Sequence, residues 1–122
     1  MELESVVSID WNSDGTLLAS GDMSGLVKVW NVRQKKSIAQ FEEEEVEFIK
    51  FHPTFKQYLL VCQVDGNCYF YSIADGNFKI LAGPTGIRCI KAQFLSSGKE
   101  ILVLYQVMTV FFSRVNAVIR VD

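Results

Sequence analysis

The stretch GDMSGLVKVWN at residues 21–31 decides the fold class of this chain. It joins a turn, DMSG at residues 22–25, to a segment in which the β-branched Val27 and Val29 alternate with other side chains up to Trp30. A two-residue period with β-branched and aromatic side chains is typical of a β-strand, and a glycine-containing turn directly before it indicates a hairpin. The sequence therefore predicts an antiparallel hairpin whose second strand ends in an aromatic residue.

The same pattern returns further along the chain. VDGNCYFYS at residues 64–72 is a second turn followed by a strand rich in aromatic side chains. Equivalent positions in successive units are 40 to 43 residues apart, and we expect the aromatic ones to pack in the core between units. The recurring positions are Trp11, Gly25, Trp30, Phe51, Asp65, Gly66, Tyr71 and Phe94.

Short strands joined by short turns are predicted for most of the chain. Four fit into residues 5–41 and four more into 45–81, while 87–106 hold an incomplete third unit before a divergent tail at 107–122. A repeat of this length with four strands is typical of a β-propeller blade. The predicted fold class is therefore all-β, without long helices. We expect one partial β-propeller domain of two and a half to three four-stranded antiparallel blades.

These units resemble WD repeats. In that family the third strand of a repeat usually ends in Trp-Asp and follows a turn that contains Asp-Gly. Here WN at residues 30–31 and YS at 71–72 stand in the place of Trp-Asp, and DG at 65–66 matches the turn. The resemblance implies a β-propeller that acts as a non-catalytic scaffold for protein–protein interaction.

The copies also depart from the family pattern. The Gly-His pair that usually precedes the first strand is absent from both. Of the family's buried polar network, Ser20 and Trp30 are present in the first unit, but Ser24 stands where Asp is usual. In the second unit Asp65 fits and Val61 does not. We therefore do not expect a complete polar network to rigidify these blades.

A finer resemblance extends over residues 5–105, in the runs GDMSGLVKVWNV, EVEFIKFHP and VDGNCYFYSIADGN. These runs are similar to a group of WD-repeat proteins whose fungal members act in ribosome assembly. The animal members of that group have roles in cell migration and angiogenesis. The resemblance implies a scaffold in the cytoplasm, with the nucleus as the alternative, whose partner is a protein with a Lys/Arg-rich segment.

The pattern ends after Gln106, and two interpretations of the tail stay open. AVIRVD at residues 117–122 is either a late third strand or part of a sequence from a variant transcript, and we favour the second. Propellers contain about four to eight blades. An incomplete set leaves two apolar blade faces bare, so we expect a fragment or truncated isoform of a longer propeller.

The strongest local charge signal is acidic. Glu42, Glu43, Glu44 and Glu45 are consecutive, and Glu47 follows closely, in the connection that enters the second unit. Clustered carboxylates at the rim of a propeller attract a basic peptide through long-range electrostatics. The alternative is a solvated turn whose charges only keep strand edges apart. We take these five residues as the candidate partner-binding site.

Composition excludes several function classes. The 122 residues are 49% apolar with a formal net charge of −2, so no basic excess favours nucleic-acid binding. The N-terminus lacks the features of a signal peptide, and the longest apolar run, residues 101–112, is shorter than the roughly 20 residues of a membrane span. We expect no nucleic-acid partner and no membrane partner.

Three cysteines and one histidine give no zinc-ligand pattern, and we expect no metal and no cofactor. The thiols of Cys62, Cys68 and Cys89 are expected to be reduced, with a disulfide between Cys62 and Cys68 across a hairpin as the minor alternative. His52 lies in the turn HPTF, where a surface position is expected rather than a catalytic base. The sequence GPTG at 83–86 lacks the Lys of a phosphate-binding loop.

No enzyme is therefore predicted. A hydrolase built on a propeller is the weakest alternative, because no nucleophile turn such as GxSxG is present. The basic turn formed by Arg33, Lys35 and Lys36 is expected to be a solvated hairpin tip. The remaining alternative is a truncated product without independent activity.

Overall fold

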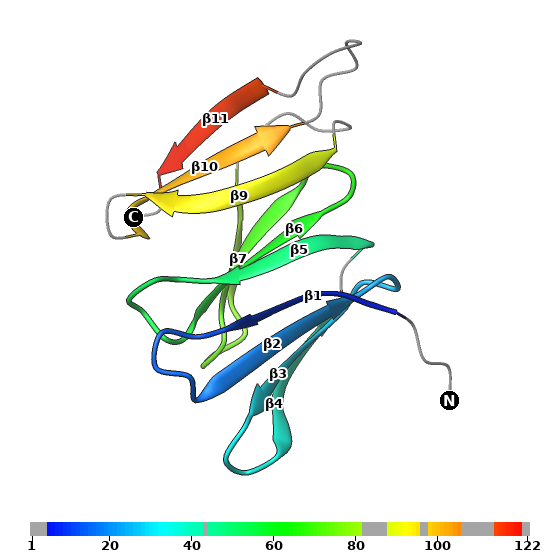
Figure 1. Cartoon of the computed structure of the whole chain (residues 1–122), viewed down its shortest axis with the longest axis vertical. Helices are drawn as coiled ribbons and strands as arrows, with labels where there is room; N and C mark the ends of the chain where they lie inside the picture. Colours follow the sequence, from blue (N-terminus) through cyan, green and yellow to red (C-terminus); the bar gives the residue numbers. More distant parts are fainter. Residues whose placement is uncertain (1–4, 43, 82–87, 96–97, 106–113, 121–122) are drawn as a thin grey trace.

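The computed structural model describes residues 5–42, 44–81, 88–95, 98–105 and 114–120, and these residues form three antiparallel sheets (Figure 1). Sheet one runs in the order β1 (Val6–Trp11), β2 (Leu17–Asp22), β3 (Leu26–Asn31) and β4 (Lys36–Glu42). Sheet two contains β5 (Val46–Phe51), β6 (Tyr58–Gln63), β7 (Cys68–Ser72) and β8 (Phe78–Leu81). Sheet three contains β9 (Cys89–Leu95), β10 (Glu100–Tyr105) and β11 (Arg114–Arg120), in the order β11-β10-β9. The described part of the chain has no α-helix, and the all-β fold class is confirmed.

The hairpin turns form because an aspartate side chain accepts hydrogen bonds from the backbone two residues later. Asp22 Oδ1 accepts from the N–H of Ser24 at 2.9 Å, and Asp65 Oδ1 accepts from the N–H of Asn67 at 2.9 Å. Gly25 and Gly66 then take φ values of 95° and 96°, which side chains other than glycine rarely adopt. These turns fix the register of the strands on either side.

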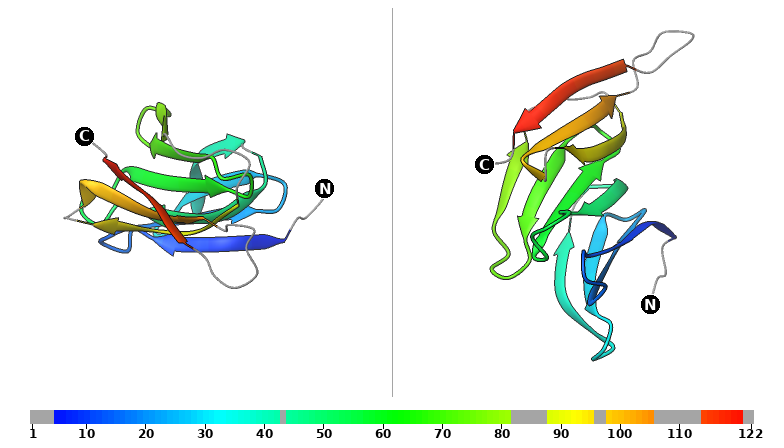
Figure 2. Two further views of the ribbon diagram at one scale, coloured as in Figure 1. Left: turned by 90° about the horizontal axis from the view of Figure 1, so that it is seen from above. Right: turned by 60° about the vertical axis from the view of Figure 1, so that its left-hand side comes forward.

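The three sheets stack face to face, from β1–β4 at the bottom of Figure 1 to β9–β11 at the top. The first strands of neighbouring sheets, β1 and β5 and then β5 and β9, lie side by side (Figure 2). Ser8 Oγ accepts a hydrogen bond from the N–H of Ile49 at 3.0 Å, and Asp10 Oδ2 accepts one from the N–H of Phe51 at 2.8 Å. Two polar side chains of β1 thus hold the backbone of β5.

The core consists of two apolar layers on the two faces of sheet two. Leu59 and Val61 of β6 face sheet one, whereas Leu60 and Cys62 face sheet three. Successive side chains of a strand point to opposite faces, so a strand between two sheets is buried on both. All four side chains are 0% exposed, which explains the continuous apolar run YLLVC.

The recurring aromatic residues do not share one environment. Phe51 and Tyr71 are buried between sheets one and two, and Phe94 is partly buried. Trp11, however, is 50% exposed, so the expectation that it is a core residue is wrong, and Trp30 is partly buried. Repeat spacing places a residue on a strand but does not reveal whether a neighbouring sheet covers its face.

Both tryptophans lie on the face of sheet one that is turned away from sheet two. The strand register places Trp11 opposite Leu18, and Leu18 opposite Trp30, while Ser8 and Asp10 point the other way toward β5. Trp30 Nε1 donates a hydrogen bond to Ser20 Oγ at 3.3 Å on the same face. We call this surface the open face, made of Ile9, Trp11, Leu18 and Trp30.

Part of the tail belongs to sheet three. β11 pairs antiparallel with β10 and so occupies the third-strand position, as the first interpretation of the tail expects. The origin of residues 107–122 and the boundaries of the repeat units stay predictions.

Candidate functional site

Acidic side chains gather where sheets one and two meet at one end of their strands. The β2–β3 turn, the β4–β5 connection and the β6–β7 turn all lie at this end, because the strands alternate in direction. Glu42, Glu44 and Glu45 are exposed there, and Glu43 lies outside the described residues. The N–H of Val64 donates to the carbonyl oxygen of Glu45 at 2.9 Å, which brings the turn of the exposed Asp65 beside the glutamates.

We call Glu42, Glu44, Glu45 and Asp65 the acidic edge. Glu42 ends β4, Glu44 and Glu45 lie in the connection to β5, and Asp65 lies in a hairpin turn much later in the chain. The surface is thus built by the fold and not by the glutamate run alone. Four exposed carboxylates held at one end of two sheets produce a local negative potential that attracts cationic side chains.

Glu47 does not belong to the acidic edge. Its carboxylate accepts two hydrogen bonds from Arg88, from Nε at 3.1 Å and from Nη2 at 3.1 Å. The Glu47 side chain is only 20% exposed, and a bidentate guanidinium–carboxylate pair is the strongest form of such contact. Glu47 therefore links sheet two to the residue before β9, and its charge is already compensated.

Asp22 lies at the same end but serves its own turn. Burial acts to raise the pKa of this carboxyl group, but hydrogen bonds from Ser24 and from the backbone N–H of Leu26 outweigh it. The pKa of Asp22 therefore lies below its usual value, and the group stays ionised at neutral pH. Its Oδ1 atom is occupied by the turn, and the carboxylate adds negative charge to this end.

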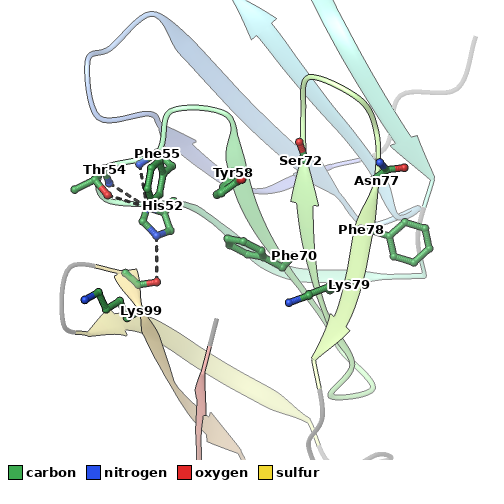
Figure 3. A pocket seen from close by; sticks show the side chains of 11 residues that line it. His52, Thr54, Phe55, Tyr58, Phe70, Ser72, Asn77, Phe78, Lys79 and Lys99 are labelled. Atoms are coloured by element: carbon green, nitrogen blue, oxygen red, sulfur yellow. Dashed lines mark hydrogen bonds between the residues drawn. The ribbon is translucent and has the colours of Figure 1, made fainter. Parts of the chain in front are cut away.

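A cavity of about 600 Å³ opens at the opposite end, between sheet two and the β9–β10 turn (Figure 3). Aromatic rings of Phe55, Tyr58, Phe70 and Phe78 form much of its wall. The remaining lining residues are His52, Thr54, Ser72, Asn77, Lys79, Gly98 and Lys99. Among these residues no carboxylate or thiol is present to act together with an imidazole.

His52 is buried beside this cavity, so the expected surface position is wrong. Only 3% of the residue is exposed. Nδ1 accepts hydrogen bonds from the N–H groups of Thr54 at 3.1 Å and Phe55 at 3.0 Å, and Nε2 lies 3.1 Å from the carbonyl oxygen of Gly98. The imidazole is therefore neutral, with its proton on Nε2 donated to Gly98. The backbone of this turn thus bonds to the side chain of His52. In the sequence, the turn is indicated by Pro53, directly after His52.

Both ring nitrogens are thus engaged in structural bonds, which argues against His52 as a general base. Burial lowers the pKa of His52, and the hydrogen bond to Gly98 opposes this shift only in part. The contact joins sheet two to the β9–β10 turn. At the same end, Lys56 Nζ lies 2.9 Å from Asp14 Oδ2 and joins sheet two to sheet one.

Other kinds of site find little support in the described residues. No group of three His, Cys, Asp or Glu side chains in this part of the chain could hold a metal ion. The same residues contain no helix long and apolar enough to cross a membrane. Arg33 and Lys35 are exposed in the β3–β4 turn, and Lys36 is exposed at the start of β4, at the end opposite to the acidic edge.

Stacked four-stranded antiparallel sheets, each continuous in sequence, are the blades of a β-propeller. Residues 3–31 match the family model "WD domain, G-beta repeat". The matched residues include β1, β2 and β3 of sheet one, so this part of the chain is a WD repeat.

Relatives of known name agree with this class. Over 103 residues, 84% of this chain, it is 35% identical to angio-associated migratory cell protein from Homo sapiens, of which it covers 23%. It is 36% identical over 106 residues, 79% of this chain, to ribosome assembly protein SQT1 from Saccharomyces cerevisiae, of which it covers 24%. A WD repeat-containing protein 89 homolog from Dictyostelium discoideum is 37% identical over 75 residues, 59% of this chain and 20% of that protein. The chain thus spans about a quarter or less of these relatives.

Proposed function

We propose that this chain is part of a non-catalytic scaffold that binds a Lys/Arg-rich protein segment at the acidic edge. WD-repeat domains generally mediate protein interactions, and this coarser function follows from the family. The observation that carries the finer proposal is the exposure of Glu42, Glu44, Glu45 and Asp65 at one end of two sheets. No basic side chain is paired with these four in the described contacts, whereas Glu47 and Asp14 each have a cationic partner.

The relatives suggest which basic segment to test first. One of them is named as a ribosome assembly protein. Proteins that assemble on RNA carry Lys and Arg to neutralise phosphate, so the terminal segment of a ribosomal protein is a suitable ligand. A role in cell migration has support only from the name of the human relative. We place the scaffold in the cytoplasm, with the nucleus as the alternative, which a fluorescent fusion tests.

The test is titration of a Lys/Arg-rich peptide against the chain and against a variant with Glu42, Glu43, Glu44 and Glu45 replaced by Lys. Exposed ion pairs contribute about 0.2–1 kcal/mol each, so the four reversals should weaken binding by roughly ten-fold to a hundred-fold. Binding to the unmodified chain should also fall with added salt, because exposed charges are screened beyond about 8–10 Å at 0.1–0.15 M.

A matched pair of single substitutions separates position from net charge. Glu44→Gln and Asp75→Asn each remove one negative charge, the first at the acidic edge and the second in the β7–β8 turn at the other end. We expect weaker binding for Glu44→Gln and unchanged binding for Asp75→Asn. If the peptide bound the chain and the four-fold variant with equal affinity, and salt had no effect, the glutamates would be only a solvated turn and not a binding site.

A further inference from the structure

Two cysteines of sheet two lie directly opposite each other on neighbouring strands. Cys62 of β6 pairs in register with Cys68 of β7, and the two Sγ atoms are 2.8 Å apart. The hairpin between them is closed by the N–H of Gln63, which donates to the carbonyl oxygen of Asn67 at 2.8 Å. Cys68 Sγ donates a hydrogen bond to Cys62 Sγ.

Their backbone positions suit a disulfide. Directly opposite residues of an antiparallel pair have Cα atoms about 4.5–5.5 Å apart, within the range of about 4.4–6.8 Å that disulfides span. The bond itself is about 2.05 Å long, so the sulfur atoms need only small side-chain rotations to reach it. Neither strand has to shift its register.

We propose that Cys62 and Cys68 are a reversible disulfide-forming pair, oxidised by a low-molecular-weight disulfide such as glutathione disulfide. The thiolate of one cysteine attacks a sulfur of glutathione disulfide, forming a mixed disulfide and releasing one glutathione thiolate. The second cysteine thiolate then attacks the protein sulfur of the mixed disulfide and releases the second glutathione. Two protein thiols are oxidised, one glutathione disulfide is reduced, and the two thiol protons pass to the glutathione thiolates or to solvent.

Access to the pair requires a local opening of the hairpin. Cys62 is 0% exposed and Cys68 is 1% exposed, between sheets two and three. The β6–β7 turn beside them, however, is at the surface with Asp65 exposed. Hairpin ends open more readily than the rest of a sheet. We therefore expect slow exchange that reaches equilibrium and is fully reversed by excess thiol.

Oxidation joins β6 to β7 by a covalent bond next to this turn. The turn also bonds to the β4–β5 connection, through Val64 and Glu45. The disulfide thus removes the opening motion of the hairpin at the junction of sheets one and two. The proposal stands on the geometry of the pair and holds whether or not the acidic edge binds a basic segment.

The experiment is equilibration of the full chain in glutathione buffers of defined ratio, followed by acid quench, alkylation under denaturing conditions, trypsin digestion and mass spectrometry. Cleavage after Lys56 and Lys79 leaves both cysteines in one peptide, residues 57–79, whereas Cys89 falls in another. The oxidised form of the first peptide takes no alkyl group and is two hydrogens lighter than the dithiol. Cys89 reports alkylation efficiency in the same sample.

We expect the equilibrium constant for the internal disulfide to be at least about ten-fold larger in the folded chain than in the chain unfolded in urea, because the fold holds the two sulfurs together. A Cys68→Ser variant cannot form the internal disulfide, so its Cys62 should be recovered either alkylated or as the mixed disulfide with glutathione. Equal or smaller constants in the folded chain, or preferential pairing of either cysteine with Cys89, would overturn the proposal. The comparison uses unmodified protein, so it remains decisive if the variant does not fold.

Discussion

His52 is the only histidine of the chain, and the fold uses both of its ring nitrogens. Nδ1 accepts from two backbone N–H groups, a role that only the neutral ring can fill. Protonation would break these bonds and place a charge in a site that is 3% exposed. The neutral imidazole therefore stabilises the contact between sheet two and the β9–β10 turn.

This predicts a stability that falls at acidic pH. The pKa of His52 lies below its ordinary value of 6.5, so the unfolded chain binds a proton there at a higher pH than the folded chain. The contribution of His52 is full above pH 6.5 and is lost as the pH falls through the lowered pKa. Lys79 and Lys99 line the same cavity.

The check is the thermal midpoint at pH 5.5 and 7.5, for the chain and for a His52→Gln variant. The midpoint of the unmodified chain should be lower at pH 5.5. His52→Gln should have a lower thermal midpoint than the unmodified chain at pH 7.5. Its own midpoint should differ much less between pH 5.5 and pH 7.5. If the thermal midpoint of His52→Gln changed with pH as much as that of the unmodified chain, another titrating group would be responsible.

Gly98 should be the least replaceable of the turn glycines. Its φ is +90°, and a Cβ built on it would overlap the ring of His52. Gly76 has a similar φ of +74° but no atom within 4 Å of such a Cβ, so it is a matched control. Left-handed backbone alone costs roughly 1–2 kcal/mol for a residue other than glycine. Displacing a packed side chain adds about 1–3 kcal/mol.

Urea denaturation of Gly76→Ala and Gly98→Ala checks this difference. We expect Gly76→Ala to lose only the backbone cost and Gly98→Ala to lose clearly more free energy of unfolding. Equal losses in the two variants would mean that the contact between Gly98 and His52 is absent in solution.

At the scale of elements, turn chemistry made the strands predictable. The four strands predicted for residues 5–41 correspond to β1–β4, and the four predicted for 45–81 correspond to β5–β8. Local hydrogen bonds of Asp side chains and the conformations of Gly are encoded within four or five residues, so sequence alone is sufficient. β11 lacks such turn signals, and its place in sheet three follows only from pairing with β10.

Contacts between elements could not be predicted in this way. Glu47 and Arg88 are separated by 41 residues, and nothing near either residue in the sequence indicates the ion pair. The hydrogen bonds from Ile49 and Phe51 to Ser8 and Asp10 span the same interval. Each depends on how one sheet stacks on the next. The glutamate run could therefore be recognised in the sequence. The pairing of Glu47 with Arg88, which separates Glu47 from the acidic edge, could not.

At the scale of the whole molecule, sheet two is covered on both faces while sheet one is covered on one. Leu17, Ala19, Val27 and Val29 pack against sheet two and are at most 5% exposed. On the other side of the same sheet, Trp11 is 50% exposed and Ile9 is 60% exposed. Contiguous exposed apolar surface of this kind marks a place where another surface packs.

The open face therefore predicts self-association of the 122-residue chain, and its two tryptophans are the only ones in the sequence. Intrinsic fluorescence consequently reports on this face alone, and its emission should shift to shorter wavelength as association removes water from Trp11 and Trp30.

Removing one large apolar side chain from such an interface costs about 1.5–3 kcal/mol, so Trp11→Lys should weaken association by at least about ten-fold. Met23→Lys is the control, because Met23 is similarly exposed, at 48%, but lies in the β2–β3 turn away from the open face. Sedimentation over a range of concentrations measures both variants. Association that is absent in the unmodified chain, or weakened equally by Met23→Lys, would show that the open face is not the surface that drives it.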